Sequence, residues 1–150
     1  MSLFRKKEFF TVGEQEKIIQ AIKEAETRTS GEVRLYVESH CRFVDPIDRA
    51  AEIFWALKMD LTKDRNGVLV YVALKDRQLA VLGDEGINQR VGKEFWDVEV
   101  SKMLERFRKH DYAEGLVSII EDIGNALHTH FPYDQETDKN ELPDDIVFGR

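Results

Sequence analysis

Two short loops in the middle of the chain carry the residue types that bind hard cations. The first contains Asp64 and Asn66, the second contains Asp84 and Glu85, and each loop also contains glycine. Carboxylate, amide and backbone oxygens presented by loops are the ligands that calcium and magnesium prefer in proteins. These loops therefore predict a site for a divalent cation, with Ca²⁺ as the first expectation and Mg²⁺ as the second.

The apolar runs between these loops predict how the loops come together. Residues 68–74 form a continuous run rich in β-branched side chains, which is typical of a strand buried on both faces. A second run at 79–82 follows a polar turn at Asp76, so the shortest connection is an antiparallel hairpin. Because a hairpin brings its outer ends together, we expect the two polar loops to lie side by side at one edge of a sheet.

A third loop reaches the same edge through a predicted crossover. Residues 32–39 alternate between apolar and polar side chains, as a strand with one better-buried face does. An Asp-Pro pair at 45–46 then marks a helix start, because Asp is a favoured N-cap and Pro is favoured at the first helical position. A strand, a helix and the strand at 68–74 make a βαβ unit with parallel strands. The loop at 29–32 then joins the other two, and Glu32 becomes a further candidate ligand.

The remaining apolar periodicities predict helices that cover the sheet. Thr11 and Glu14 form a capping box at the start of the first helix. Another helical pattern follows Gly86 and is expected to bend or break at Gly92, and the last runs through residues 116–127. The fold class is therefore α/β, a three-layer α/β/α sandwich in which a small mixed β-sheet carries helices on both faces.

The helix that begins at residue 46 has an apolar stripe that we expect to face the sheet. Its members recur at helical spacing and are Ile47, Ala50, Ala51, Phe54 and Leu57. Trp55 and Trp96 also sit among core-spaced residues and are predicted to pack in the interior.

Length, composition and charge indicate how many domains the chain forms and which classes of partner it can bind. A chain of 150 residues with 42% hydrophobic residues fits one globular domain. We expect an N-terminal extension at 1–10, the domain at 11–132 and an acidic, mobile tail at 133–150, of which Leu142 and residues 146–148 can still dock on the domain. The formal net charge of -7 argues against nucleic acid and favours a cation or a cationic protein partner.

The sequence also indicates a cytoplasmic location. Cys41 is the only cysteine and cannot form an internal disulfide, which is typical of a reducing compartment. The first ten residues have no apolar core long enough for a signal peptide, and no later stretch reaches the length of a membrane span.

Several short motifs, taken in their order and separation, resemble the TPM domain family. They are Thr29-Ser30-Gly31-Glu32, Asn66-Gly67-Val68-Leu69-Val70-Tyr71-Val72-Ala73, Asp76-Arg77, Gly83-Asp84-Glu85-Gly86 and Asp111-Tyr112-Ala113-Glu114-Gly115-Leu116. The resemblance covers residues 10–131 and implies an α/β/α sandwich whose loops bind a divalent cation such as calcium, with phosphatase activity in some members. Many members carry an aromatic residue and Gly-Leu-Glu where this chain has Asp84 to Asn88, and many are exported or membrane-anchored. The chain looks closest to the short, soluble bacterial members.

Three functional interpretations stay open. The first is a cation-binding domain that uses the loop oxygens. The second is a metal-assisted phosphatase in which Asp84 serves as nucleophile or metal ligand, with Arg65 and Arg90 as the nearby cations that could hold phosphate. The third is a non-catalytic module that binds another protein. Against the cation site stands the interpretation that Asp64 and Asp84 are turn formers whose side chains bond local amides, and in that case the search turns to protein partners.

Overall fold

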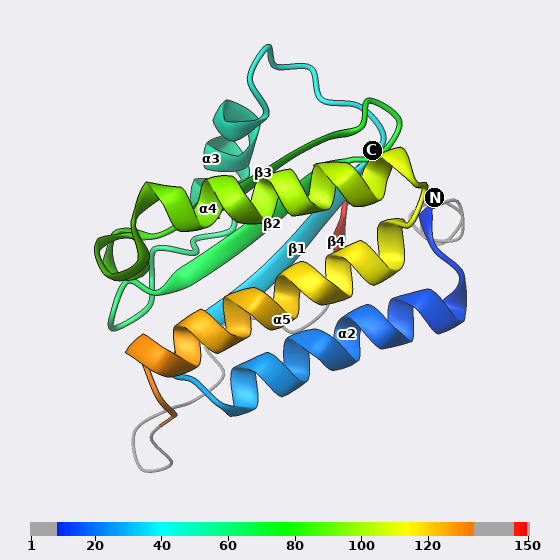
Figure 1. Ribbon diagram of the computed structural model, residues 1–150. Helices are drawn as coiled ribbons and strands as arrows, with labels where there is room; N and C mark the ends of the chain where they lie inside the picture. The colour runs from blue at the N-terminus through cyan, green and yellow to red at the C-terminus, as the bar shows by residue number, and fades with distance from the viewer. Residues whose placement is uncertain (1–8, 134–145, 150) are drawn as a thin grey trace.

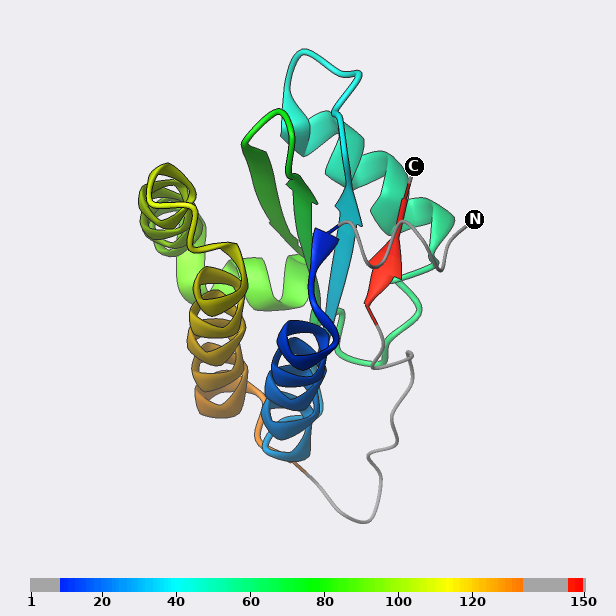
Figure 2. The ribbon, with the colours of Figure 1, turned by 90° about the vertical axis from the view of Figure 1, so that its right-hand side faces the viewer.

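A four-stranded mixed sheet with helices on both faces forms the domain, as the computed structural model shows for residues 9–133 and 146–149 (Figure 1). The helices are α2 (Val12–Thr27), α3 (Pro46–Ala56), α4 (Glu85–Arg108) and α5 (Tyr112–His130). The strands are β1 (Glu32–Glu38), β2 (Gly67–Ala73), β3 (Gln78–Gly83) and β4 (Val147–Phe148). Figure 2 shows the sheet between α3 on one side and the layer of α2, α4 and α5 on the other. The predicted α/β/α sandwich is confirmed.

The strand order is β3-β2-β1-β4, and β2 is the central element. β1 and β2 run parallel, with Glu32 opposite Gly67, whereas β2 and β3 form the antiparallel hairpin. All seven residues of β2 are buried, as a strand covered on both faces must be. Both the parallel crossover and the hairpin agree with the sequence prediction.

The end of the chain docks on the sheet. Val147 and Phe148 pair with β1 in parallel, and the Phe148 ring stacks on Phe9 with the ring centroids 5.7 Å apart. The predicted docking of residues 146–148 is thus confirmed, while most of the predicted tail, residues 134–145, lies outside the described residues.

The predicted helix signals act as expected. The Thr11 side chain accepts a hydrogen bond from the Glu14 amide, and the Glu14 carboxylate accepts one from the Thr11 amide, which completes the capping box. Gly92 has φ 78° and breaks α4 into two parts, because few residues other than glycine adopt that backbone conformation readily. None of the helices in the described part of the chain is both long and apolar enough to cross a membrane.

The predicted inward stripe of α3 is only partly correct. Ala50, Ile53 and Phe54 are buried against the sheet, but Trp55 is 57% exposed and Ile47 is 36% exposed. The prediction that Trp55 packs in the core is wrong, because Trp55 lies on the side of α3 turned away from the buried residues Ala50, Ile53 and Phe54. Trp96 is buried as predicted, and its Nε1 donates to the Asn88 Oδ1 at 2.7 Å.

A buried acid lies where α4 packs on α5. Glu99 is 3% exposed, and its Oε1 has no hydrogen-bond partner among the described residues. The Lys102 ammonium lies 3.5 Å from Glu99 Oε2 and 3.1 Å from Asp122 Oδ2 on α5. Burial, assisted by the neighbouring Asp122, raises the pKa of Glu99 to about 7.

We predict that Glu99→Gln removes a pH-dependent loss of stability. The pKa of Glu99 is higher in the folded state than its ordinary value of 4.5, so ionisation disfavours folding. Ionisation of Glu99 therefore lowers the free energy of unfolding. This loss is absent below the pKa of the unfolded state, grows as the pH rises and is complete above the pKa of the folded state. The variant should match wild type near pH 4 and be more stable near pH 8 by up to about 3 kcal/mol, as measured by urea unfolding. Glu105→Gln, at an exposed acid of the same helix, is the control, and equal pH profiles for wild type and Glu99→Gln would contradict the prediction.

Candidate functional site

The hairpin brings its two outer loops together, as predicted. The Asp84 amide donates to the Gly67 carbonyl at 2.9 Å, and the Gly86 amide donates to the Arg65 carbonyl at 2.8 Å. At Gly86 the backbones approach so closely that a Cβ atom would lie 2.0 Å from the Asp64 carbonyl oxygen. Glycine is therefore required at this contact, and the two loops form one continuous surface.

The loop before β1 completes this edge. The Glu32 amide lies 3.4 Å from the Asn66 carbonyl oxygen, to which it donates. The Asn66 Nδ2 donates to the Ser30 hydroxyl at 3.2 Å, and the Asn66 amide donates to the Thr62 hydroxyl at 3.2 Å. The side chain of Asn66 is thus held in place, yet its buried Oδ1 has no hydrogen-bond partner among the described residues. A buried oxygen of this kind is normally paired in proteins, so a water molecule or an ion is the expected partner.

Asp84 is held by a salt bridge that the sequence did not predict. Arg65 contacts both carboxylate oxygens, with Nε 2.6 Å from Oδ2 and Nη2 2.8 Å from Oδ1. Asp84 is 6% exposed and is also the N-cap of α4, where its Oδ1 accepts a hydrogen bond from the Glu85 amide. The hydrogen bonds to Asp84 raise the pKa of the Arg65 guanidinium. Arg65 itself has φ 51°, a conformation that is uncommon for a non-glycine residue.

The other predicted ligands surround this pair at different depths. Glu32 is 2% exposed, whereas Asp64 and Glu85 are exposed at the surface, with Glu85 Oε1 3.4 Å from Arg65 Nη1. Within residues 9–133 and 146–149, no group of three or more His, Cys, Asp or Glu side chains is placed to hold a metal ion. A cation at Asp84 would compete with the Arg65 guanidinium for the carboxylate.

The same contacts limit the chemistry of a phosphatase. A carboxylate nucleophile needs an oxygen free to attack phosphorus, and both oxygens of Asp84 accept charged hydrogen bonds. The second predicted phosphate ligand, Arg90, lies over the Phe131 ring with its guanidinium carbon 5.3 Å from the ring centroid. Of the two arginines predicted to hold phosphate, Arg65 is thus neutralised by Asp84 and Arg90 lies against an aromatic ring.

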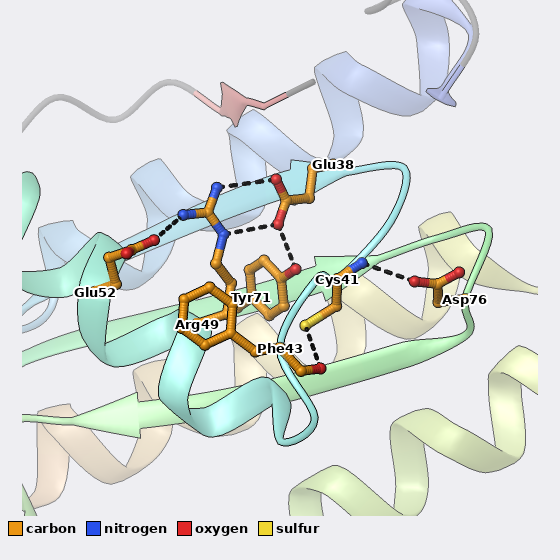
Figure 3. Close-up of polar contacts among 7 residues, drawn as sticks. All are labelled: Glu38, Cys41, Phe43, Arg49, Glu52, Tyr71 and Asp76. Carbon is orange, nitrogen blue, oxygen red and sulfur yellow. Dashed lines mark hydrogen bonds and ion pairs between the residues drawn. The ribbon is translucent and has the colours of Figure 1, made fainter.

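A second polar cluster lies at the opposite end of the sheet, where β1 ends (Figure 3). Arg49 of α3 forms a bidentate salt bridge to Glu38, with Nε–Oε2 at 2.9 Å and Nη2–Oε1 at 3.0 Å. The Tyr71 hydroxyl donates to the same carboxylate, and Arg49 also bonds Glu52. Burial raises the pKa of Tyr71, and the hydrogen bond to Glu38 raises it further. Every charge in this cluster has its partner, so the cluster fastens α3 to the sheet.

The loop into α3 is tied to the hairpin turn beside this cluster. The Cys41 amide donates to the Asp76 Oδ2 at 2.7 Å, and the His40 Nδ1 lies 2.9 Å from the Asp76 Oδ1. The Cys41 thiol donates to the Phe43 carbonyl at 3.6 Å (Figure 3). In doubly wound sheets ligands bind beyond the carboxyl ends of parallel strands, but here that end is filled by a satisfied network.

Sequence reasoning missed this cluster because Glu38 was expected on the less buried face of its strand. A usable signal existed. An acidic residue closes a strand at Glu38, and a single arginine, Arg49, sits among the apolar residues of the following helix. Such a pair of opposite charges on a strand end and on the helix that follows it is a candidate salt bridge, although the sequence does not show that the two side chains meet.

Comparison with known proteins gives one family and two similar structures. A sequence model of the TPM domain matches residues 3–126. The NMR structure of the BA42 protein from the psychrophilic bacterium Bizionia argentinensis is 42% identical, with a TM-score of 0.85, and the match covers 94% of this chain and 96% of that one. The N-terminal domain of the cg2496 protein from Corynebacterium glutamicum is 15% identical and shares the fold, with a TM-score of 0.62 over 79% of this chain and 74% of that one. No curated protein matches the chain.

We predict that Asp84→Asn lowers the free energy of unfolding by about 1 to 2 kcal/mol in metal-free buffer. Asn is as good an N-cap as Asp, so the loss reports mainly the charged hydrogen bonds to Arg65. Asp97→Asn, which removes only an exposed pair with Lys93, should cost about 0.5 kcal/mol or less. Urea unfolding with EDTA measures both, and equal losses would show that the Arg65 salt bridge contributes no more than a surface pair.

We also predict that Tyr71→Phe destabilises the domain by about 1.5 to 3 kcal/mol, since it removes a buried hydrogen bond to a charged group and leaves the ring in place. Tyr112→Phe removes an exposed hydroxyl that bonds His110 and should cost about 0.5 kcal/mol or less. Thermal unfolding monitored by circular dichroism compares the two. A neutral Tyr71→Phe would mean that Arg49 alone satisfies Glu38.

Proposed function

Because the chain belongs to the TPM domain family, we propose that its three-loop edge binds a divalent cation, calcium in preference to magnesium. The observation that carries the proposal is the Asn66 side chain. Its Oδ1 is buried, oriented by the bond from Nδ2 to Ser30, and without a hydrogen-bond partner among the described residues. A buried acceptor left in this state costs free energy, and a cation would satisfy it.

The charge for such a site comes from the acids on the adjoining loops. Glu32 and Asp84 are both buried, and a buried carboxylate binds a cation at a smaller desolvation cost than an exposed one. Asp64 and Glu85 are exposed next to them and can move inward to complete an oxygen shell, since calcium accepts six to eight ligands in flexible geometry.

Arg65 acts in this proposal as the cation that the metal replaces. The guanidinium holds Asp84 in position when no metal is bound, and its side chain is 35% exposed, so it can turn toward solvent and keep its contact with Glu85. Replacement exchanges one positive charge for two at the buried carboxylate. Removing the Asp84 carboxylate should therefore weaken metal binding, whereas removing the Arg65 guanidinium should strengthen it.

No described contact favours catalysis over cation binding. Two alternatives stay predictions. One is a phosphatase that uses Asp84, and the other is a non-catalytic domain that binds another protein. Phosphoester turnover that requires Asp84 would support the first, and it is worth measuring once cation binding has been tested.

We predict that calcium shifts the amide resonances of residues 64–67 and 83–86 and raises the unfolding temperature of the wild type. Binding to the native state alone adds RT ln(1 + [L]/Kd), about 2.7 kcal/mol at a hundredfold excess over Kd. Asp84→Asn should bind at least about tenfold more weakly, whereas Arg65→Met should bind more tightly because the competing charge is gone.

Asp97→Asn is the matched control, an acid outside the loop edge whose replacement should leave calcium affinity unchanged. If millimolar calcium and magnesium shift no amide of the three loops, the proposal fails and the acids are turn formers. If Arg65→Met binds calcium as weakly as Asp84→Asn does, then the metal does not replace the Arg65 guanidinium. That part of the proposal is then wrong even though a cation binds.

A further inference from the structure

Two cavities lie on the seam between α4 and α5, with volumes of about 370 and 400 Å³. Glu99 of α4 and Asp122 of α5 line both of them, so the two acids stand where the cavities meet. The apolar side chains that line the cavities on either side of this acid pair are Phe95, Ala126, Met103 and Ile119. A charged centre between apolar walls suits a ligand that joins a positive charge to an alkyl chain.

In the described part of the chain, the acid pair has one positive partner for two carboxylates. Glu99 is 3% exposed, and its Oε1 has no hydrogen-bond partner among the described residues. The positive partner is Lys102, whose ammonium lies 3.1 Å from Asp122 Oδ2 and 3.5 Å from Glu99 Oε2. Arg106, which lines one of the cavities, is paired with Asp111 instead. Buried carboxylates are normally compensated, so a second positive group would be favourable here.

In the free protein a proton takes the place of this second charge. Burial, assisted by Asp122, raises the pKa of Glu99 to about 7, so Glu99 is protonated below neutral pH. Of the other ionisable groups that line the cavities, Glu105 and Arg106 are held in ion pairs, and His130 lines the second cavity. A positive group that enters beside Glu99 favours the ionised form and expels this proton.

We infer that the Glu99–Asp122 pair binds a primary alkylammonium ion, with the ammonium between the two carboxylates and the alkyl chain along the apolar wall of a cavity. The Lys102 ammonium is the same chemical group and already contacts both carboxylates. Its side chain is 59% exposed, so it can yield the position to a ligand. No three His, Cys, Asp or Glu side chains of the described chain are placed to hold a metal ion, whereas an ammonium needs only acceptors for its three donors. The ligand class is therefore an amine.

The test is a titration of the full chain with n-butylammonium chloride near pH 8 in EDTA, followed by amide NMR. Amides of residues 91–106 and 115–130, which contain the lining of the cavities, should shift and saturate. The expected dissociation constant is about 1 to 10 mM, since the ligand offers one charge and a short chain. n-Butanol has the same chain without the charge, and sodium chloride has the charge without the chain. Neither should shift these amides at the same concentration.

Four variants assign the contacts. Glu99→Gln and Asp122→Asn each remove one carboxylate charge and should bind butylammonium at least about tenfold more weakly. Lys102→Met removes the competing ammonium and should bind it about tenfold more tightly. Glu121→Gln is the matched control, because it makes the same charge change at the next position of α5 but lines a different groove, between α2 and α5. It should bind as wild type does, and the amide spectrum of each free variant reports its fold.

The pH dependence supplies the second readout. Because the ligand requires ionised Glu99, its affinity should be constant above about pH 8 and fall roughly tenfold for each pH unit below about pH 6. His130→Gln should keep this slope, and loss of the slope in that variant would assign the proton to His130 and overturn the inference.

Three further results would overturn it. In the first, butylammonium shifts no amide of the seam. In the second, n-butanol or sodium shifts the same amides as strongly. In the third, Glu99→Gln or Asp122→Asn binds butylammonium as wild type does. All samples contain EDTA and the reporting amides lie outside the three loops, so the result is independent of calcium binding at the loop edge.

Discussion

The burial of β2 is the constraint on which the rest of the structure depends. All seven of its residues are covered, so its two faces require helices and its two edges require strands. The parallel register with β1 places Glu32 beside Gly67 at one end and Glu38 beside Ala73 at the other. The charged residues next to β2 then lie at these two ends, because a strand buried on both faces leaves no room for charge along its length. The loop edge and the Glu38 cluster are the two results.

The two ends resolve their charges in different ways. At the Glu38 end the carboxylate, the guanidinium of Arg49 and the hydroxyl of Tyr71 satisfy one another within the interior, which fastens α3 across the sheet. At the loop edge the Arg65 guanidinium is one third exposed and Asn66 keeps an unsatisfied oxygen. The first arrangement is complete without a ligand, whereas the second keeps an excess of acidic side chains and an unsatisfied oxygen. This difference directs the proposed cation to the loop edge.

The small sheet is covered unequally on its two faces. β4 lies beside β1 with only two residues, and β3 is the last strand of the described sheet on the other side. Among the described helices α3 alone covers the second face, and it packs on β2 and β3 through Ala50, Ile53 and Phe54. Trp55 lies on the side of α3 turned away from this buried face and is therefore exposed.

The sequence by itself determined the features that depend on neighbours in the chain. The capping box at Thr11, the Asp45 N-cap, the break at Gly92, the buried strand and its hairpin all follow from local periodicity, and the meeting of the polar loops follows from the crossover and the hairpin. Only the tertiary structure decided which charges meet. Arg65 and Asp84 are 19 residues apart and Glu38 and Arg49 are 11 apart, and neither separation is a helix or strand repeat that pairs side chains. α3 carries apolar residues around much of its circumference, and only the tertiary structure decided that the side with Ala50, Ile53 and Phe54 meets the sheet while Trp55 is exposed.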